Sequence, residues 1–161
     1  MGQLGQTTSP AEGAAGGLSL VFRAGSLLCA LRLDEVIETL RPLGVRPLAG
    51  TPAFVLGVTI LRGVPAPVVD VGRLLGGGES EVARFVAVRT EHGPVAFATG
   101  PVLGIRATGA GTAAQHGTLL GGASDALVAG VATLDAEPLL ILQSMRVVPN
   151  EVWAAAARSP R

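Results

Sequence analysis

Short apolar runs, interrupted by glycine, proline or charged residues every several positions, extend from Leu18 to about residue 148. Runs of this length that are rich in Val, Leu and Ile are typical of an all-β protein. The stretch LSLVFRAGSLLCALRL predicts a hairpin that turns at Ala24-Gly25-Ser26, because glycine adopts the positive φ angles of tight turns at little cost. The strands predicted for the first half cover residues 18–23, 27–31, 36–40, 58–61 and 64–69.

The pattern of strands repeats once along the chain. A shift of 66 positions places Val21-Phe22-Arg23 on Ala87-Val88-Arg89, and a shift of 73 positions places Gly57-Val58 on Gly130-Val131. Two copies of about seventy residues are too few for a solenoid, in which several repeats share one continuous core. The repeat therefore predicts two similar small β units within one chain.

Helical content is expected to be small. Asp70 precedes VGRLLG, where its side chain can cap the backbone N–H groups of a single turn that stops at Gly76. Asn150 can cap a second helix at EVWAAAARS, which has Glu151 at its positive end and four alanines of high helix propensity. Trp153 is the expected anchor of this C-terminal helix. The segments GGGESE and GAGTAAQHG are loops by composition.

Composition favours a folded globular body, since hydrophobic residues make up 48% of the 161 residues and charged residues 15%. Twelve basic side chains, all arginine, balance twelve acidic ones, so no net field attracts nucleic acid or an acidic membrane surface. No apolar run approaches the ~20 residues of a membrane-spanning helix. Residues 1–17 lack the basic start and apolar centre of a secretory signal and are expected to be a disordered, soluble tail. These features indicate a cytoplasmic protein.

Few residues offer the chemistry of a catalytic or metal site. His92 and His116 are isolated in glycine-bearing sequence and lack the spacing of metal ligands. Cys29 lies in an apolar strand, where a buried thiol is the common case, and as the sole cysteine it excludes an intrachain disulfide. The glycine-rich stretches lack the Gly-Lys-Ser/Thr ending of a nucleotide-binding loop, and the chain contains no lysine. The sequence therefore predicts no catalytic residue, no metal and no cofactor.

Arg62 lies in the predicted turn between the strands at 58–61 and 64–69, and two interpretations of it stay open. Its guanidinium either remains solvated or pairs with a carboxylate on a neighbouring strand, for which Glu38 is the natural candidate. Asp70, at the end of the same stretch, is explained by its capping position.

The stretch GVTILRGVPAPVVDVGRLLG closely resembles the signature of the CheW family, Gly-Val-x-Asn-Leu-Arg-Gly-x-x-x-Pro-Val-x-Asp-Leu. The resemblance continues through LVFRAGSLLCALRLDEVIE and LVAGVATLDAEPLLIL and covers about residues 18–148. It implies two packed five-stranded β-barrels of the Src-homology-3-like kind, the first at about 18–76 and the second at about 82–148, followed by a C-terminal helix and tail at 149–161. It also implies a non-enzymatic adaptor in chemotaxis or motility signalling. Such adaptors couple the cytoplasmic tips of chemoreceptors to the regulatory domain of the histidine kinase CheA.

The resemblance also assigns roles to residues that match the family's motif. It implies that Val36 and Glu38 lie on a receptor-facing strand, and that Arg62 is an interface residue that pairs with Glu38. Asp70 and Trp153 are expected to be structural. The residues predicted to bind partners are Val36, Glu38, Gly57, Arg62, Gly63 and Val64.

Two departures from the family's pattern lead to an alternative. Ile60 stands where the signature has asparagine, and Thr99-Gly100-Pro101-Val102 stands where members commonly have Val-Asp-x-Val. Pro101 lacks the N–H that an edge strand could offer to a partner. We therefore expect receptor binding to persist and kinase binding to be weakened; the alternative is a divergent member that has lost kinase binding. A small-ligand-binding β-barrel domain is a second alternative, and it would require a concave pocket with convergent polar groups.

Overall fold

The computed structural model describes residues 17–77, 81–108, 127–143 and 148–158. Almost all of the expected tail at 1–17, the loop at GAGTAAQHG with His116, and the centre of the loop at GGGESE lie outside the described residues. Within the described ranges, no helix has the length and apolar character needed to cross a membrane.

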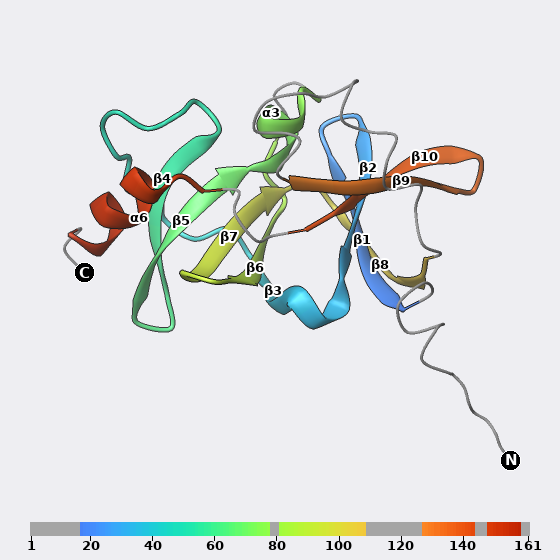
Figure 1. Cartoon of the computed structure of the whole chain (residues 1–161), viewed down its shortest axis with the longest axis horizontal. Coiled ribbons are helices and arrows are strands. Elements are labelled where there is room, and N and C mark those ends of the chain that lie inside the picture. The colour runs from blue at the N-terminus through green and yellow to red at the C-terminus, as the bar shows by residue number, and fades with distance from the viewer. Residues whose placement is uncertain (1–16, 78–80, 109–126, 144–147, 159–161) are drawn as a thin grey trace, which may run out of the picture.

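Ten strands in the described ranges form two five-stranded sheets (Figure 1). Sheet I has the strand order β8-β1-β2-β10-β9, and sheet II has the order β3-β6-β7-β5-β4. The predicted all-β class is confirmed. The strands are β1 (Leu18–Ala24), β2 (Leu27–Arg32), β3 (Val36–Leu40), β4 (Val55–Leu61), β5 (Val64–Asp70), β6 (Arg84–Thr90), β7 (Gly93–Thr99), β8 (Val102–Ala107), β9 (Val128–Leu134) and β10 (Glu137–Leu142).

The sheets do not follow the expected division of the chain into a first barrel and a second barrel. Sheet I combines β1 and β2 with β8, β9 and β10, whereas sheet II combines β3, β4 and β5 with β6 and β7. Four strand pairs join the two halves of the chain: β1 with β8, β2 with β10, β3 with β6, and β5 with β7. The strands therefore do not separate near Gly76–Glu81, because each half contributes to both sheets.

Strand pairing follows the internal repeat in both sheets. Leu20 pairs with Leu31 in sheet I, and the residues 66 positions further along, Val86 and Phe97, pair in sheet II. The β1–β8 and β3–β6 pairs each contain one irregularity of register, at equivalent positions. The two units predicted from the repeat are therefore present, and each has exchanged its first two strands with the other.

Apolar side chains fill three clusters. The largest contains residues of both sheets, among them Phe22 of β1 and Phe97 of β7, each of which is fully buried. Adjacent strand residues point to opposite faces, so Val21 and Ala87 belong to two smaller clusters, one for each sheet. Burial of a phenylalanine side chain contributes about 1.5–3 kcal/mol relative to an exposed one. The main cluster is therefore the principal source of cohesion between the sheets.

Helix α3 (Val71–Leu75) follows β5 directly and matches the predicted single turn. The Asp70 side chain accepts a hydrogen bond from the Arg73 backbone N–H at 3.1 Å, which caps the helix. The helix ends at Gly76, whose φ of 81° lies in the left-handed region that favours glycine. Both the predicted cap and the predicted stop are confirmed.

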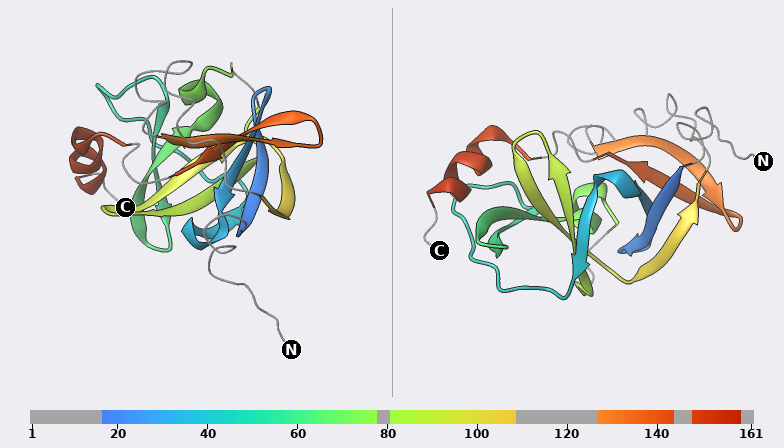
Figure 2. Two further views of the ribbon diagram at one scale, coloured as in Figure 1. Left: turned by 45° about the vertical axis from the view of Figure 1, so that its right-hand side comes forward. Right: turned by 90° about the horizontal axis from the view of Figure 1, so that it is seen from below.

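Helix α6 (Asn150–Ala157) lies at the end of sheet II away from sheet I, as Figures 1 and 2 show. The expectation that Asn150 caps it is wrong, because Asn150 is the first helical residue and Pro149 occupies the cap position without a capping side chain. The Pro149 carbonyl accepts from the Val152 N–H at 3.0 Å, so the helix begins one residue earlier than predicted. Trp153 is half-buried and packs against the main cluster.

Candidate functional site

The turn between β4 and β5 consists of Arg62 and Gly63. Their φ angles are 52° and 82°, and positive φ at both central residues is the requirement of a type I′ hairpin turn. The twist of a type I′ turn matches the twist of the flanking strands. The antiparallel pairing of β4 with β5 therefore continues up to Leu61 and Val64, the residues on either side of the turn. Arginine is uncommon at a positive φ angle. The tight turn restricts the backbone of Arg62 and thereby the direction in which its long cationic side chain leaves the turn.

Arg62 makes a bidentate ion pair with Glu38 of β3. Its Nε lies 2.8 Å from Glu38 Oε2, and its Nη2 lies 3.1 Å from Glu38 Oε1. The Arg62 side chain is 75% exposed and that of Glu38 is 30% exposed. The hydrogen bonds from Arg62 lower the pKa of the Glu38 carboxyl from its ordinary value, so the carboxylate stays ionised. Of the two interpretations of Arg62, the paired one is confirmed.

This ion pair connects opposite edges of sheet II, since β3 forms one edge and β4 the other. Three exposed apolar residues are close to these residues in the sequence: Ile37 precedes Glu38, Ile60 lies two positions before Arg62, and Val64 follows the turn. Exposed apolar side chains mark candidate protein interfaces, and arginine is the charged residue that is enriched at interface centres. We refer to Ile37, Glu38, Ile60, Arg62 and Val64 together as the signature-turn patch.

Two of the residues predicted to bind partners are packed within the protein. Val36 is half-buried and packs against the main cluster. Gly57 is buried with a φ of 147°, and a Cβ at this position would lie 2.1 Å from the Arg46 carbonyl oxygen. The missing side chain lets Arg46 and Val58 exchange two backbone hydrogen bonds of 2.8 Å. Gly57 therefore positions the segment before β4 and contributes no surface of its own.

A counterpart of the signature turn occurs in sheet I, and our sequence analysis did not identify it. The turn between β9 and β10 has positive φ at Asp135 (51°) and Ala136 (65°), and Asp135 Oδ2 lies 3.8 Å from Arg106 Nη2 of β8. The shift of 73 positions places Asp135 on Arg62, so the repeat contained the signal. The charges are reversed: here the turn carries the carboxylate and the edge strand carries the guanidinium.

The segment that departs from the family's pattern in the second half lies against β1. The Gly100 N–H donates to the Arg23 carbonyl at 2.8 Å, and the Arg23 N–H donates to the Pro101 carbonyl at 2.9 Å. A Cβ on Gly100 would lie 3.1 Å from the Arg23 carbonyl oxygen, closer than most real Cβ contacts. Gly100 and Pro101 therefore connect β7 to β8, and their backbone groups are bonded to β1.

The cysteine and the described histidine, the other residues considered for catalysis or metal binding, show no arrangement typical of a catalytic or metal site. Burial raises the pKa of the Cys29 thiol to about 12, which keeps it protonated and unreactive at neutral pH. His92 is exposed in the turn between β6 and β7. Among the described residues, no group of three or more His, Cys, Asp or Glu side chains is arranged to hold a metal ion.

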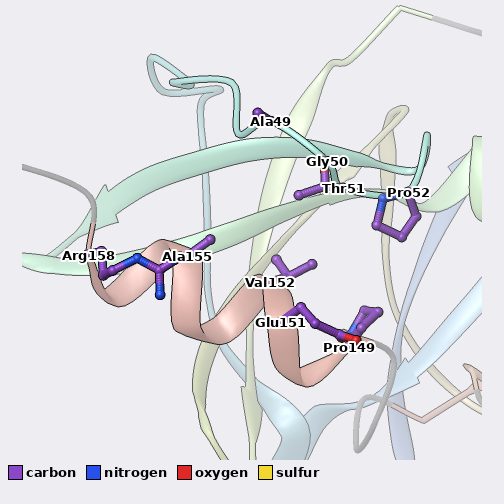
Figure 3. A pocket seen from close by; sticks show the side chains of 9 residues that line it. All are labelled: Ala49, Gly50, Thr51, Pro52, Pro149, Glu151, Val152, Ala155 and Arg158. Carbon is purple, nitrogen blue, oxygen red and sulfur yellow. The ribbon is translucent and has the colours of Figure 1, made fainter.

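A groove of about 610 Å³ lies between α6 and the segment before β4 (Figure 3). Small and apolar residues form most of it, and its charged side chains, Glu151 and Arg158, are both exposed. Convergent buried polar groups, which a small-ligand site would require, are not among its lining residues in the described chain. The lining residues are Ala49, Gly50, Thr51, Pro52, Pro149, Glu151, Val152, Ala155 and Arg158.

Comparison with known proteins identifies the family. The model of the CheW-like domain matches residues 19–151. Protein FrzA of Myxococcus xanthus is 41% identical over 61 residues, which span 38% of this chain and 38% of FrzA. The crystal structure of the scaffolding protein TtCheW from Thermoanaerobacter tengcongensis superposes with a TM-score of 0.67 at 20% identity, covering 82% of this chain and 92% of that one, and so shares the fold. Because the CheW-like model spans most of the chain, this protein belongs to the CheW-like family.

Proposed function

We propose that this protein is a non-enzymatic adaptor that couples the cytoplasmic tips of chemoreceptors to the regulatory domain of a CheA-type histidine kinase. It would act in the cytoplasm, recruited to receptor arrays, in chemotaxis or another form of motility signalling. The proposal is supported by membership of the CheW-like family and, above all, by the exposed Arg62–Glu38 pair in the signature turn.

The signature-turn patch is the proposed receptor-binding surface. A guanidinium carries five N–H donors, and two of those on Arg62 bond Glu38, so three remain for a partner. The ion pair fixes the direction of these donors before binding, which reduces the entropy lost on association. The exposed side chains of Ile37, Ile60 and Val64, which are near Glu38 and the turn in the sequence, would add apolar area to the interface. A receptor helix with apolar side chains and a carboxylate or amide acceptor would match this arrangement.

Replacement of Arg62 tests the receptor surface. We expect Arg62→Ala to raise the dissociation constant for a purified receptor tip about tenfold or more, because it removes both the remaining donors and the orientation of Glu38. Arg32→Ala is the matched control, since Arg32 is also exposed and pairs with an acidic residue, Asp34, away from the turn. Equal receptor affinity of Arg62→Ala and the unmodified protein would remove this patch from the receptor interface.

Kinase binding is proposed to be weaker than in typical members of the family. Gly100 and Pro101, which stand where members of the family commonly have a charged residue, carry no charged side chain. The Gly100 N–H and the Pro101 carbonyl already form hydrogen bonds with Arg23 of β1. Titration of the purified protein against the receptor tip and the kinase regulatory domain, at equal salt, separates the two activities. Tight kinase binding without receptor binding would reverse the assignment, and tight binding to both would show that the departures at Ile60 and Gly100 are neutral.

A further inference from the structure

Helix α6 and the segment before β4 form the two walls of the groove of about 610 Å³ (Figure 3). Residues 49–52 make one wall, and Val152 and Ala155 belong to the other. Small-ligand sites combine an apolar lining with a few convergent buried polar groups. Because the described lining lacks such groups, the groove is better suited to an apolar segment of protein than to a small polar molecule.

The helix wall of the groove is held in place from inside the protein. Val152 is buried within the main cluster, and Trp153 packs against the same cluster. Glu151, Ala154 and Arg158 are exposed on the helix. A partner would therefore meet a surface that is already fixed, which lowers the entropy lost on association.

Opposite charges lie at the two ends of the helix wall. Glu151 is in the first turn of α6 and Arg158 is its C-terminal cap residue, and both line the groove. Seven positions correspond to about two helical turns, so the two residues share one face about 10 Å apart. Within the described ranges, neither side chain has an ion-pair partner. The wall therefore presents a carboxylate, a short apolar stretch and a guanidinium in this order.

This order of charges is complementary to itself when its direction is reversed. We propose that the groove binds helix α6 of a second copy of this chain, with the two helices antiparallel about a two-fold axis. Glu151 of each copy then pairs with Arg158 of the other, so that one contact occurs twice, as is usual at an isologous interface. Ala155, between them, is small enough for the two helices to approach closely.

The size of the interface determines how strong this dimer is. Eight helical residues extend over about 12 Å, which provides much less surface than a stable dimer buries. The dimer is therefore weak and reversible, and it forms where the local concentration of the chain is high. No residue of the signature-turn patch lines the groove, so this inference is independent of the proposed adaptor function.

Sedimentation equilibrium of the 161-residue chain, from about 5 µM to about 500 µM, tests the dimer. We expect the average mass to rise from that of a monomer towards that of a dimer, with a dissociation constant on the order of 100 µM. Glu151→Arg and Arg158→Glu should each raise this constant about tenfold or more, because each makes both symmetric contacts repulsive. An equimolar mixture of the two variants should associate at least as tightly as the unmodified chain, since both contacts between unlike copies are attractive.

Two controls separate this pairing from general effects of charge. Asp34→Arg and Arg32→Glu make the same charge changes in an exposed ion pair elsewhere, so they should leave the dimer unchanged, alone or mixed. Ala155→Gln fills the centre of the groove without adding charge and should also weaken the dimer about tenfold. Circular dichroism shows whether each variant keeps its fold.

Four outcomes would each overturn the proposal. They are a chain that stays monomeric throughout, charge variants that dimerise as well as the unmodified chain, a mixture that associates no better than its components, and control variants with the same effects. A groove that binds a segment of another protein instead would give the first of these.

Discussion

The Arg62 guanidinium favours the ionised form of the Glu38 carboxylate, which lies 24 positions away in the sequence, on β3. Its hydrogen bonds lower the pKa of Glu38 in the folded protein, while the unfolded chain retains the ordinary glutamate value. A depressed folded pKa means that the stabilising contribution of the pair is present above the unfolded pKa. The contribution is lost as pH falls through the folded pKa. The signature turn is therefore expected to keep its ion pair at neutral and mildly acidic pH and to release it in stronger acid.

The first prediction concerns this titration. Arg62→Ala should raise the pKa of Glu38 to the ordinary glutamate range, because the first and largest cause of its depression, the hydrogen bond from Arg62, is removed. Carboxyl carbon shifts followed by NMR across acidic pH measure it directly. Arg32→Ala should leave the Glu38 titration unchanged. A Glu38 pKa that stays depressed in Arg62→Ala would show that another group holds the carboxylate ionised.

At the scale of elements, turn chemistry explains where the strands end. Gly63 occupies the second position of the β4–β5 turn with a φ of 82° and has open space around it. Ala136 occupies the equivalent position in the β9–β10 turn with a φ of 65°. A side chain in the left-handed region costs about 1–2 kcal/mol relative to glycine before the greater freedom of unfolded glycine is subtracted. The two turns thus form a matched pair for measuring this cost.

The second prediction follows from that pair. Gly63→Ala should lower the free energy of unfolding by about 1 kcal/mol without any clash, and Ala136→Gly should raise it by about 0.5–1 kcal/mol. Urea denaturation of both variants gives the two changes. Gly57→Ala should be considerably more damaging than Gly63→Ala, because its Cβ would meet the Arg46 carbonyl. Changes of the same sign at Gly63 and Ala136 would contradict the assignment of both turns.

The third prediction concerns the cap of α3. Asp70→Ala should lower the free energy of unfolding by about 1 kcal/mol, because the Arg73 N–H loses its side-chain acceptor. Asp70→Asn should retain most of the stability, since asparagine caps helices about as well as aspartate. Thermal unfolding of the two variants measures the difference. Equal losses for both would point to the carboxylate charge instead of the capping bond.

Local signals in the sequence were sufficient to predict the positions of the strands and of helix α3. They were insufficient to predict the residue at which helix α6 begins. β3 occupies the predicted residues, and α3 begins and ends where Asp70 and Gly76 indicated. These boundaries depend on turn and cap residues that act over a few positions. Asn150 misled because either it or Pro149 could precede the first turn, and Pro149, with extended backbone angles of φ −62° and ψ 152°, occupies the cap position. The Arg62–Glu38 pair was one of two interpretations, since 24 positions separate the partners.

At the scale of the whole molecule, the sequence predicted two units but not their exchange of strands. In both sheets the central strands are buried on both faces, as Phe22 and Val21 illustrate in β1. Such strands lack the apolar–polar alternation that would distinguish one neighbour from another. The repeat also gives β1 and β6 similar patterns, so either could have paired with β3. Partner choice is settled by long-range packing of the complete chain.

The fourth prediction tests the exchange. A fragment of residues 1–77 should lack a cooperative unfolding transition on its own, because β1 and β2 would be without β8 and β10. An equimolar mixture with residues 81–161 should recover β structure and a cooperative transition, as circular dichroism can show. Cooperative unfolding of the first fragment as a monomer would show instead that 18–76 is an independent unit.

Strand order in sheet I also has a consequence for synthesis on the ribosome. β2 ends at Arg32, but its parallel neighbour β10 begins at Glu137, which the ribosome adds roughly 5–20 seconds later at ordinary elongation rates. All strands of sheet II lie between residues 36 and 99, so that sheet can assemble while sheet I still lacks three strands. The nascent β1–β2 hairpin, apolar on both faces, therefore remains incompletely covered for most of translation, and this interval is when the chain is most exposed to chaperones and to aggregation.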